Sequence, residues 1–347
     1  GTIGSDTEQK EIKAIYDINS MRIPTNKPSK RNDMPDLVVN DTQQQTAAVI
    51  RSVREMHAKG RPVLVSWESI ADTRMFHERF KQETGIDAQV LNGEQNEPAE
   101  VIIQRAGQKG MVTIATNLAS RGVDILLGEG VEELGGIHVI GTRHFQSGRI
   151  DDQLRGRAGR QGRPGSSQFI ISLTDSLYKN FLGRERVDQL NAVQDKDERR
   201  QAVGLAQKKA EEHNFFVRLR RYKVYQVLDR QMTLFYGEMG RLFNQKRMYL
   251  IFPEYAKKEK IENVNNIDEM ESFLNVFIAL SFIKAYSQHF QRLTDLSEEF
   301  DREDEGAFEK GLDGLRETAD QDMKQVLQDF RGNFFDWFGR ISTVPRR

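Results

Sequence analysis

The sequence contains no cysteine and only 6 histidines among its 347 residues. Without cysteine the chain can form no disulfide, cannot use a thiolate as a nucleophile and cannot bind zinc through sulfur. The histidines are scattered along the chain, so their spacing indicates no metal site. The lack of cysteine excludes folds stabilised by disulfides and enzymes with a catalytic thiol. The few, scattered histidines lead us to expect no metal centre.

Long apolar runs are also lacking. The longest strongly apolar run, FLNVFIALSFI at 273–283, is interrupted by Asn275 and Ser281. A membrane-spanning helix needs about 20 apolar residues, so this run predicts a buried helix instead. The chain opens with Gly1 rather than Met and shows no signal-peptide pattern, which leads us to expect a fragment of a longer protein.

No excess charge of either sign is present. The 51 basic and 52 acidic residues give a formal net charge of -1. The chain as a whole therefore has no electrostatic attraction to nucleic acid or to anionic lipid, and any anion-binding site must be local. The length exceeds that of a usual single domain, so two or three compact units are expected.

The first half alternates short β-branched runs with amphipathic stretches, which predicts βαβ units and a parallel sheet. One predicted helix runs from about 69 to 84, with Gly85 just beyond it as a helix stop. The predicted strands are DLVV at 36–39, PVLVS at 62–66, AQVLN at 88–92, MVTIAT at 111–116, GGIHVIGT at 135–142 and SQFIISL at 167–173.

The second half has a helical character. Between 197 and 247 an apolar stripe recurs at helical spacing, which predicts one long helix packed on a neighbouring unit. The stripe consists of Val217, Val224, Leu228, Phe235 and Leu242. An acidic stretch at 298–314 is interpreted as a connection or a solvated face, with partner binding as the alternative.

An aromatic cluster lies near the carboxyl end of the chain. It consists of Phe334, Phe335, Trp337 and Phe338. We expect it to cap a helical bundle, with a partner-binding surface as the alternative.

Four arginines crowd the segment DDQLRGRAGRQGRPG at 151–165. Gln153, Gly156, Arg157, Gly159 and Arg160 form the pattern Q-x-x-G-R-x-G-R. Residues three apart can share one face of a helical turn, so we expect both guanidiniums to face the same anion. The alternative is a structural network of arginines with Asp151 and Asp152.

A second segment, TIATNLASRGVDILLG at 113–128, follows a predicted strand. Its glycines would let the backbone approach a phosphate, and Asp124 could accept a hydrogen bond from a ribose hydroxyl or hold an arginine. Because the arginine segment follows one strand later, the two together predict an ATP-facing lobe.

The chain resembles the second RecA-like motor lobe of superfamily 2 ATPases, and within them the C-terminal half of the SecA family. The shared segments are IPTNKP, EMHAKGRPVLV, VLN, TIATNLASRGVDILLG, ELGGIHVIGT, GRIDDQLRGRAGRQGRPGSSQF and AQKKAEEHNFFVRL. The resemblance implies an α/β RecA-like parallel-sheet lobe followed by an all-α helical scaffold and wing region.

The resemblance also assigns roles to residues. It implies that Arg157 and Arg160 are catalytic arginine fingers that reach the γ-phosphate of ATP. It implies nucleotide binding by Thr116, Gly122, Asp124, Gln153 and Gly156. The implied domains are an interlobe linker at 1–20, the second motor lobe at 21–185, a long scaffold helix at 186–252, and divergent wing and C-terminal helices at 253–347.

No G-x-x-x-x-G-K-[ST] motif occurs in the sequence, nor any Gly-Lys pair. Without the phosphate-binding lysine and an acidic Mg²⁺ ligand, the chain has neither a phosphate-binding loop nor a site for the Mg²⁺ that phosphoryl transfer needs. We therefore expect ATP and Mg²⁺ to be held mainly by an N-terminal motor lobe in cis. The 347-residue chain alone is expected not to hydrolyse ATP.

The family resemblance implies protein transport as the function. The implied partners are an unfolded preprotein, a membrane protein-conducting channel and further copies of the chain in a homo-oligomer, with no nucleic acid. The implied location is cytoplasmic, with peripheral membrane association. The alternatives are the C-terminal lobe of a superfamily 2 RNA or DNA helicase, and a non-catalytic SecA-like binding fragment.

Several positions depart from the family pattern. Val123 replaces the threonine of a Thr-Asp pair, Arg163 replaces an aspartate, and VYQV at 224–227 replaces Tyr-Asp-Asp-Val. The segment GTRHFQSGRID at 141–151 also differs from its counterpart. These departures indicate a divergent or accessory member of the family.

Overall fold

The computed structural model describes residues 3–21, 23–95, 97–116, 124–244, 308–314, 316–318, 321, 324 and 325. Several expectations fall outside these residues: the role of Gly122, the apolar run at 273–283, the aromatic cluster at 334–338, and most of the acidic stretch and of the region 253–347.

The described elements alternate strands and helices before the helical part begins. In chain order they are α1 (Asp6–Tyr16), β1 (Lys30–Asp33), β2 (Leu37–Val39), α2 (Thr42–Ala58), β3 (Val63–Trp67), α3 (Ile70–Thr84), β4 (Gln89–Leu91), α4 (Ala99–Ala106), β5 (Val112–Thr116), β6 (Ile137–Gly141), α5 (Gly148–Arg155), the 3₁₀ turn η1 (Arg160–Gly162), β7 (Pro164–Ser172), α6 (Ser176–Leu182), α7 (Arg184–Ala192) and α8 (Lys196–Asn244).

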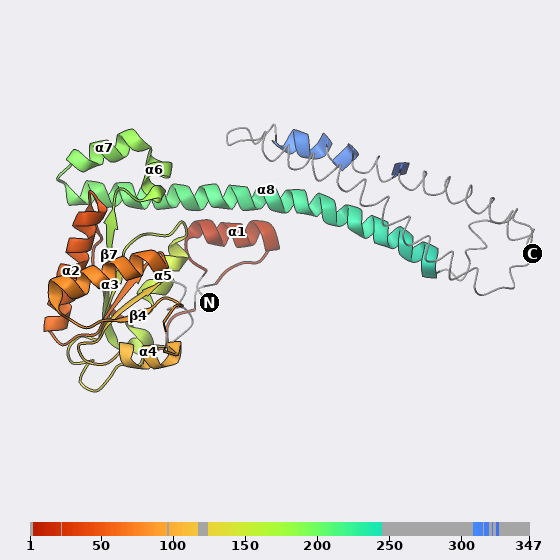
Figure 1. The fold of residues 1–347 in the computed structure, drawn as a ribbon. Helices are drawn as coiled ribbons and strands as arrows, with labels where there is room; N and C mark the ends of the chain where they lie inside the picture. Colours follow the sequence, from red (N-terminus) through yellow and green to blue (C-terminus); the bar gives the residue numbers. More distant parts are fainter. Residues whose placement is uncertain are drawn as a thin grey trace, which may run out of the picture. The chain divides into compact units, whose positions relative to one another are not determined.

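The strands form one parallel sheet with helices packed around it (Figure 1). Their order is β1-β7-β6-β3-β5-β4, and β2 also pairs with β7. This parallel α/β sheet with flanking helices confirms the expected fold class. Each of the six predicted runs overlaps one strand, although β3 extends past its run to Trp67 and β7 begins before its run, at Pro164. The expected count of about six strands was one too low, because β1 has the sequence KRND, which carries no strand signal. Its backbone pairs with β7, with Lys30 opposite Pro164.

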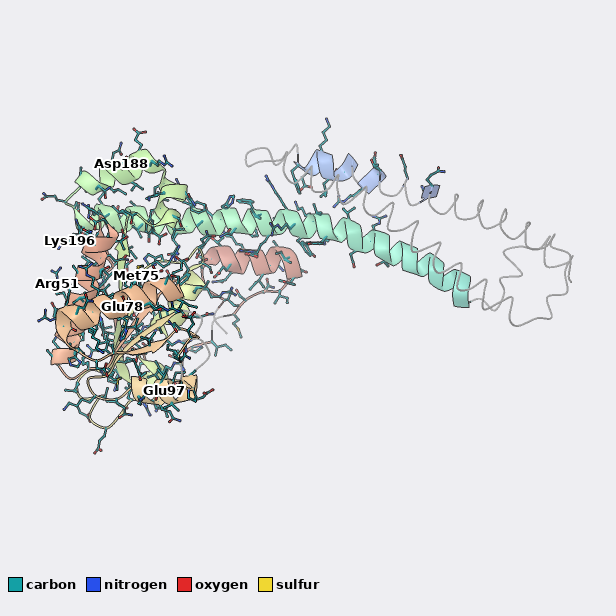
Figure 2. All side chains as sticks on the ribbon, viewed as in Figure 1. Arg51, Met75, Glu78, Glu97, Asp188 and Lys196 are labelled. Atoms are coloured by element: carbon teal, nitrogen blue, oxygen red, sulfur yellow. The ribbon has the colours of Figure 1, made fainter. Side chains whose placement is uncertain are left out.

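The two faces of the sheet bury different side chains. Val63 and Val65 of β3 pack with α2 and α3, whereas Leu64 points to the opposite face. This alternation follows from the two-residue period of a strand. On the outer surface of α2 and α3, Arg51, Met75 and Glu78 are exposed (Figure 2).

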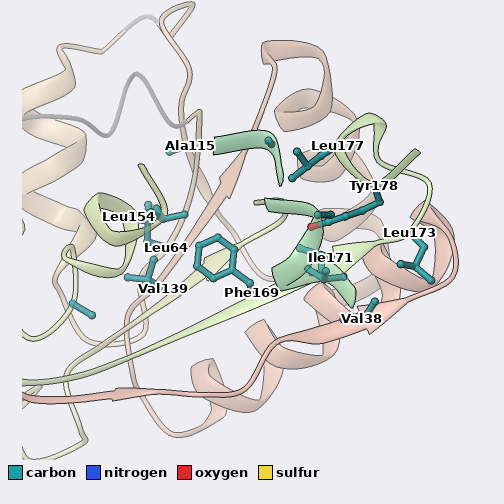
Figure 3. Close-up of a cluster of buried hydrophobic side chains, with 14 of the residues drawn as sticks. Val38, Leu64, Ala115, Val139, Leu154, Phe169, Ile171, Leu173, Leu177 and Tyr178 are labelled. Carbon is teal, nitrogen blue, oxygen red and sulfur yellow. The ribbon is translucent and has the colours of Figure 1, made fainter. Parts of the chain in front are cut away.

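The opposite face carries the larger cluster of buried residues. Leu64, Val139 and Phe169 lie in it together with Leu154 of α5 and Tyr178 of α6 (Figure 3). Ile102 of α4 and three alanines near the start of α8 also belong to it. The arginine-bearing helix α5 is thus fixed to the sheet through its apolar side.

Helix α3 has the boundaries that the sequence predicts. Ser69 caps its amino end by accepting a hydrogen bond from the Asp72 backbone N–H, and the Asp72 carboxylate accepts one from the Ser69 backbone N–H. Gly85 ends the helix in the left-handed conformation, at a φ of 67°. These are the reciprocal cap and the glycine stop that fix helix ends.

The chain divides into two compact units, Gly1–Leu219 and Arg220–Arg347, and the division falls within α8. In the first unit, α1 is held by two carboxylates. Glu8 accepts a hydrogen bond from the Ser147 hydroxyl at 2.5 Å, and Glu11 accepts two from Arg218 at 2.5 Å each. None of the described helices is both long and apolar enough to cross a membrane.

Candidate functional site

The arginine turn, which we define as residues 156–163, joins α5 to β7. Helix α5 ends at Arg155, with Gly156 as its carboxyl cap, and the 3₁₀ turn η1 begins at Arg160. Between them Gly159 has a φ of 72°, in the left-handed region. The expectation that Arg157 and Arg160 share one helical turn is therefore wrong, because the helix stops before Arg157 and Gly159 redirects the chain.

Glycine is required where this turn meets the sheet. A Cβ on Gly165, at the start of β7, would lie 2.6 Å from the backbone nitrogen of Gly159. A Cβ on Gly159 would in turn lie 2.6 Å from the Cβ of Arg31 in β1. The turn is thus packed directly onto the first residues of β1 and β7.

Arg160 bridges the arginine turn to the segment after β5. Its Nη1 donates to Oδ1 of Asp124 at 2.8 Å, and its Nε donates to the Gly156 carbonyl at 3.0 Å. The side chains of Arg160 and Asp124 are 35% and 45% exposed, so solvent reaches both groups. Of the two roles considered for Asp124, the structure shows it holding an arginine.

Arg157 lies deeper than Arg160 and is only 6% exposed. Both arginines line a small pocket with Asp124, Ile137 and Pro164. The volume of this pocket is about 20 Å³, roughly the space that one water molecule needs. This pocket therefore does not enclose a nucleotide by itself.

The pocket lies at the edge of the sheet where β6 and β7 begin, since Ile137 and Pro164 are the first residues of those strands. Thr116 lies at the opposite edge. In the register of the sheet, Val112 of β5 lies opposite Val63 of β3, and Val63 lies opposite His138 near the start of β6. Thr116 is four residues further along β5, or about 13 Å at roughly 3.3 Å per residue.

The structure therefore brings Asp124, Arg157 and Arg160 together and leaves Thr116 apart. Gly156 forms the carboxyl cap of α5, and Gln153 is half-buried on that helix. The arginine pocket lies where β6 and β7 begin, because α5 carries the chain back to the beginning of β7.

Arg155 belongs to a separate, structural cluster. Its guanidinium lies 3.5 Å from the Asp152 carboxylate and 3.9 Å from that of Asp36, and 4.6 Å from the centre of the Phe169 ring. The alternative of an arginine–carboxylate network thus describes Arg155, while Arg160 faces the pocket. Asp151, the other carboxylate of that alternative, pairs with a histidine.

His144 lies between two carboxylates in the interior. Its Nδ1 is 2.5 Å from Oδ2 of Asp151, and its Nε2 is 2.9 Å from Oδ2 of Asp36. The ring is 4% exposed and stacks on Phe169 at 4.6 Å. Burial alone would lower the pKa of His144, but the hydrogen bonds and charges of Asp151 and Asp36 outweigh it and raise this pKa to about 9.

Sequence reasoning missed this histidine. The one local signal was a histidine seven residues before an aspartate, between the end of a strand and a helix. Asp36 precedes His144 by 108 residues, so nothing local in the sequence could have paired them.

A second buried histidine, His138 in β6, has the opposite character. Its Nδ1 is 2.8 Å from the Ser166 hydroxyl and its Nε2 is 3.4 Å from the Ser52 hydroxyl, and among the described residues no carboxylate is paired with it. Burial, together with the charges of Arg61 and Lys59, lowers the pKa of His138 to about 4. His138 is therefore neutral near neutral pH, while His144 is protonated.

A larger cavity, of about 290 Å³, lies apart from the arginine turn. It is lined by Glu68, which follows β3, by Arg143, which follows β6, and by Glu8, Glu211 and Arg218. None of the predicted site residues lines it. Within the described parts of the chain, no group of His, Asp and Glu residues is arranged to hold a metal ion.

Comparison with known families gives a match to the SecA P-loop domain over residues 28–132 and 129–198. A protein translocase subunit SecA from Caldicellulosiruptor saccharolyticus is 43% identical over 250 residues, which cover 70% of this chain and 29% of the relative. A protein translocase subunit SecA 2 from Geobacillus thermodenitrificans is 39% identical over 289 residues, covering 78% and 36% respectively. The chain thus spans about a third of the length of these relatives.

Among solved structures, the Escherichia coli DEAD-box protein SrmB bound to the regulator of ribonuclease activity A is 21% identical. The match covers 46% of this chain and 87% of that chain, with a TM-score of 0.35.

Proposed function

Because the chain is a partial SecA-like protein, we propose that it is the C-terminal motor portion of an ATPase that drives polypeptides across a membrane. The names of the relatives, translocase subunits, support this proposal. Since the chain spans 29% to 36% of those relatives, the activity belongs to a longer protein that carries an N-terminal motor lobe.

The position of Arg160 is the observation that supports a nucleotide site here. Its guanidinium is partly exposed at the rim of the arginine pocket and is held by a carboxylate from a different segment, Asp124. A guanidinium offers paired donors that match phosphate oxygens. In the proposed mechanism Arg160 exchanges its Asp124 partner for the γ-phosphate when the two lobes close.

Arg157 would supply the second positive charge from its buried position beside the pocket. Gln153 and Gly156 would act through α5, because the Gly156 carbonyl accepts a hydrogen bond from Arg160. Thr116 and Gly122 are included in the proposed nucleotide site because they belong to the same segment of the chain as Asp124. Positive charges placed where negative charge develops stabilise the transition state of phosphoryl transfer.

ATP and Mg²⁺ would be held mainly by the other lobe. A pocket with the volume of about one water cannot enclose a nucleotide, and this sequence contains no phosphate-binding Gly-Lys pair. Mg²⁺ would neutralise charge on the phosphates when bound, and this chain would contribute the arginines from the opposite side.

The partners and location follow from the same proposal. We propose an unfolded preprotein as substrate, a membrane protein-conducting channel as partner, peripheral attachment to the cytoplasmic membrane surface, and homo-oligomers. The departures at Val123, Arg163 and 224–227 support an accessory member rather than the housekeeping form.

The test is ATP turnover by the product of the complete gene, measured alone, with an unfolded preprotein and with single-stranded RNA, beside the 347-residue chain. We expect stimulation by the preprotein and no turnover by the chain alone. Stimulation by RNA only would replace the proposal with a helicase. An inactive complete protein would leave a SecA-like binding protein without catalysis.

A further inference from the structure

We infer that His144 is a positioning residue that holds the arginine turn in place by tying α5 to the segment ahead of β2 through two carboxylates. Both ring nitrogens of His144 face carboxylate oxygens, from Asp151 on α5 and from Asp36 before β2. Only a doubly protonated imidazole can donate to both at once.

A protonated His144 offsets the charge of the two carboxylates that face its ring. Asp36 and Asp151 lie against His144, whereas Arg155 is shared between Asp36 at 3.9 Å and the more exposed Asp152 at 3.5 Å. Asp151 is 1% exposed, and a neutral His144 would leave a net negative charge in the interior, which is costly. The other polar and charged groups on elements packed around the cluster are Asp152 of α5, Asp175 and Tyr178 at α6, Arg200 and Gln207 of α8, and Arg143 after β6.

The cluster controls the end of α5 from which the arginine turn leaves. Arg155, the last residue of α5, contacts Asp36 and Phe169 within the cluster. The carbonyl of the next residue, Gly156, accepts a hydrogen bond from Nε of Arg160. A shift of α5 would therefore move the acceptor that orients the Arg160 guanidinium.

Helix α8 joins the same cluster within the first unit. Gln207 donates from Nε2 to Oδ2 of Asp151 at 2.6 Å and to the Phe145 carbonyl at 2.9 Å. Asp151 is thus shared by the histidine and by α8. A change in the protonation of His144 would therefore alter the contacts of Asp151 with both α5 and α8.

The first measurement is made on the wild-type 347-residue chain and needs no catalytic activity. Ring nitrogen chemical shifts are followed by NMR from about pH 5 to about pH 10. We expect His144 to be doubly protonated at about pH 7.5 and to lose its proton near pH 9, with faster exchange of the α5 amides as it does, after correction for intrinsic rates. His138 is the internal control, since it stays neutral over that range. A neutral His144 at pH 7.5 overturns the inference.

The matched variants are His144→Gln and His138→Gln, which each replace one buried histidine. At pH 7.5 we expect the amides of α5 to exchange at least about tenfold faster in H144Q and at an unchanged rate in H138Q. The difference between wild type and H144Q should disappear by about pH 10. Equal protection of α5 in both variants overturns the inference. If H144Q does not fold, the wild-type titration decides.

The consequence for catalysis rests on the proposed function. In the complete gene product, H144Q should lower kcat more than it raises KM, and the fall of wild-type kcat through pH 9 should be absent from the variant. If Arg160→Ala leaves turnover unchanged while α5 protection still depends on His144, the proposed function fails and the positioning role stands.

Discussion

At the scale of single residues, the two buried histidines show how surroundings decide charge. His144 and His138 lie near one another in sequence, and both are shielded from solvent. Two carboxylates raise the pKa of His144 after burial has opposed it, whereas burial and nearby cations lower the pKa of His138. One side chain is therefore a structural cation and the other a neutral hydrogen-bonding group.

His138 predicts a loss of stability in acid. Its pKa falls from 6.5 in the unfolded chain to about 4 in the folded chain, so its contribution is present above pH 6.5 and is lost as pH falls through 4. That shift corresponds to about 3 kcal/mol of unfolding free energy. Urea unfolding at a series of pH values should show a shallower acid loss in His138→Gln than in wild type. Parallel curves for the two proteins would rule out this role.

At the scale of elements, glycines decide how closely the arginine turn meets the sheet. Gly165 sits at the start of β7 with no room for a Cβ, because the Gly159 nitrogen would be 2.6 Å away. Gly204 lies exposed on α8, where a Cβ would have open space around it, with nothing within 4 Å. The same substitution should therefore act in opposite directions at the two sites.

Gly165→Ala should lower the unfolding free energy by about 1–3 kcal/mol, because the backbone of β7 or of the turn must shift. Gly204→Ala should raise it by about 0.4–1 kcal/mol, because alanine loses less conformational entropy in a helix. Chemical denaturation of both variants measures the two effects. Destabilisation of equal size at both positions would contradict the packing described for the turn.

The elements also show what the sequence could and could not predict. The six runs rich in Val and Ile identify their strands because buried parallel strands are apolar throughout. β1 could not be found, since KRND becomes a strand only by pairing with β7. The position of the arginine pocket could not be found either, because spacing along the chain does not tell which edge of the sheet a turn will reach. Thr116 and Asp124 are close in sequence but are not brought together in the same pocket.

At the scale of the whole molecule, the amino-terminal helix is held to the first unit by ionic contacts. Glu11 accepts two hydrogen bonds from Arg218 of α8, and Glu8 accepts one from Ser147 at the start of α5. α1 contributes no buried residue, so apolar packing adds little to its attachment. Under the proposed function this helix belongs to the linker between lobes, where a reversible attachment would let the lobes move.

Reversing one charge should release α1. Glu11→Lys should speed amide exchange in α1 about fivefold, the equivalent of roughly 1 kcal/mol for a partly exposed pair, and the effect should shrink at high salt. The swap Glu11→Lys with Arg218→Glu should restore protection. Failure of the swap to restore it would mean that the pair does not hold the helix.

In the proposed mechanism Arg160 acts on ATP from one side of a split site, and ATP turnover by Arg160→Ala in the complete gene product measures that action. Arginine fingers contribute about 10³–10⁵ in kcat, so we predict a fall of at least about a hundredfold with preprotein present. Arg79→Ala is the control, because Arg79 is also exposed and paired with a carboxylate, Glu83 at 2.6 Å, but lies on α3 outside the pocket. Loss of turnover in R160A with normal turnover in R79A is the predicted result, and unchanged turnover in R160A would contradict the account.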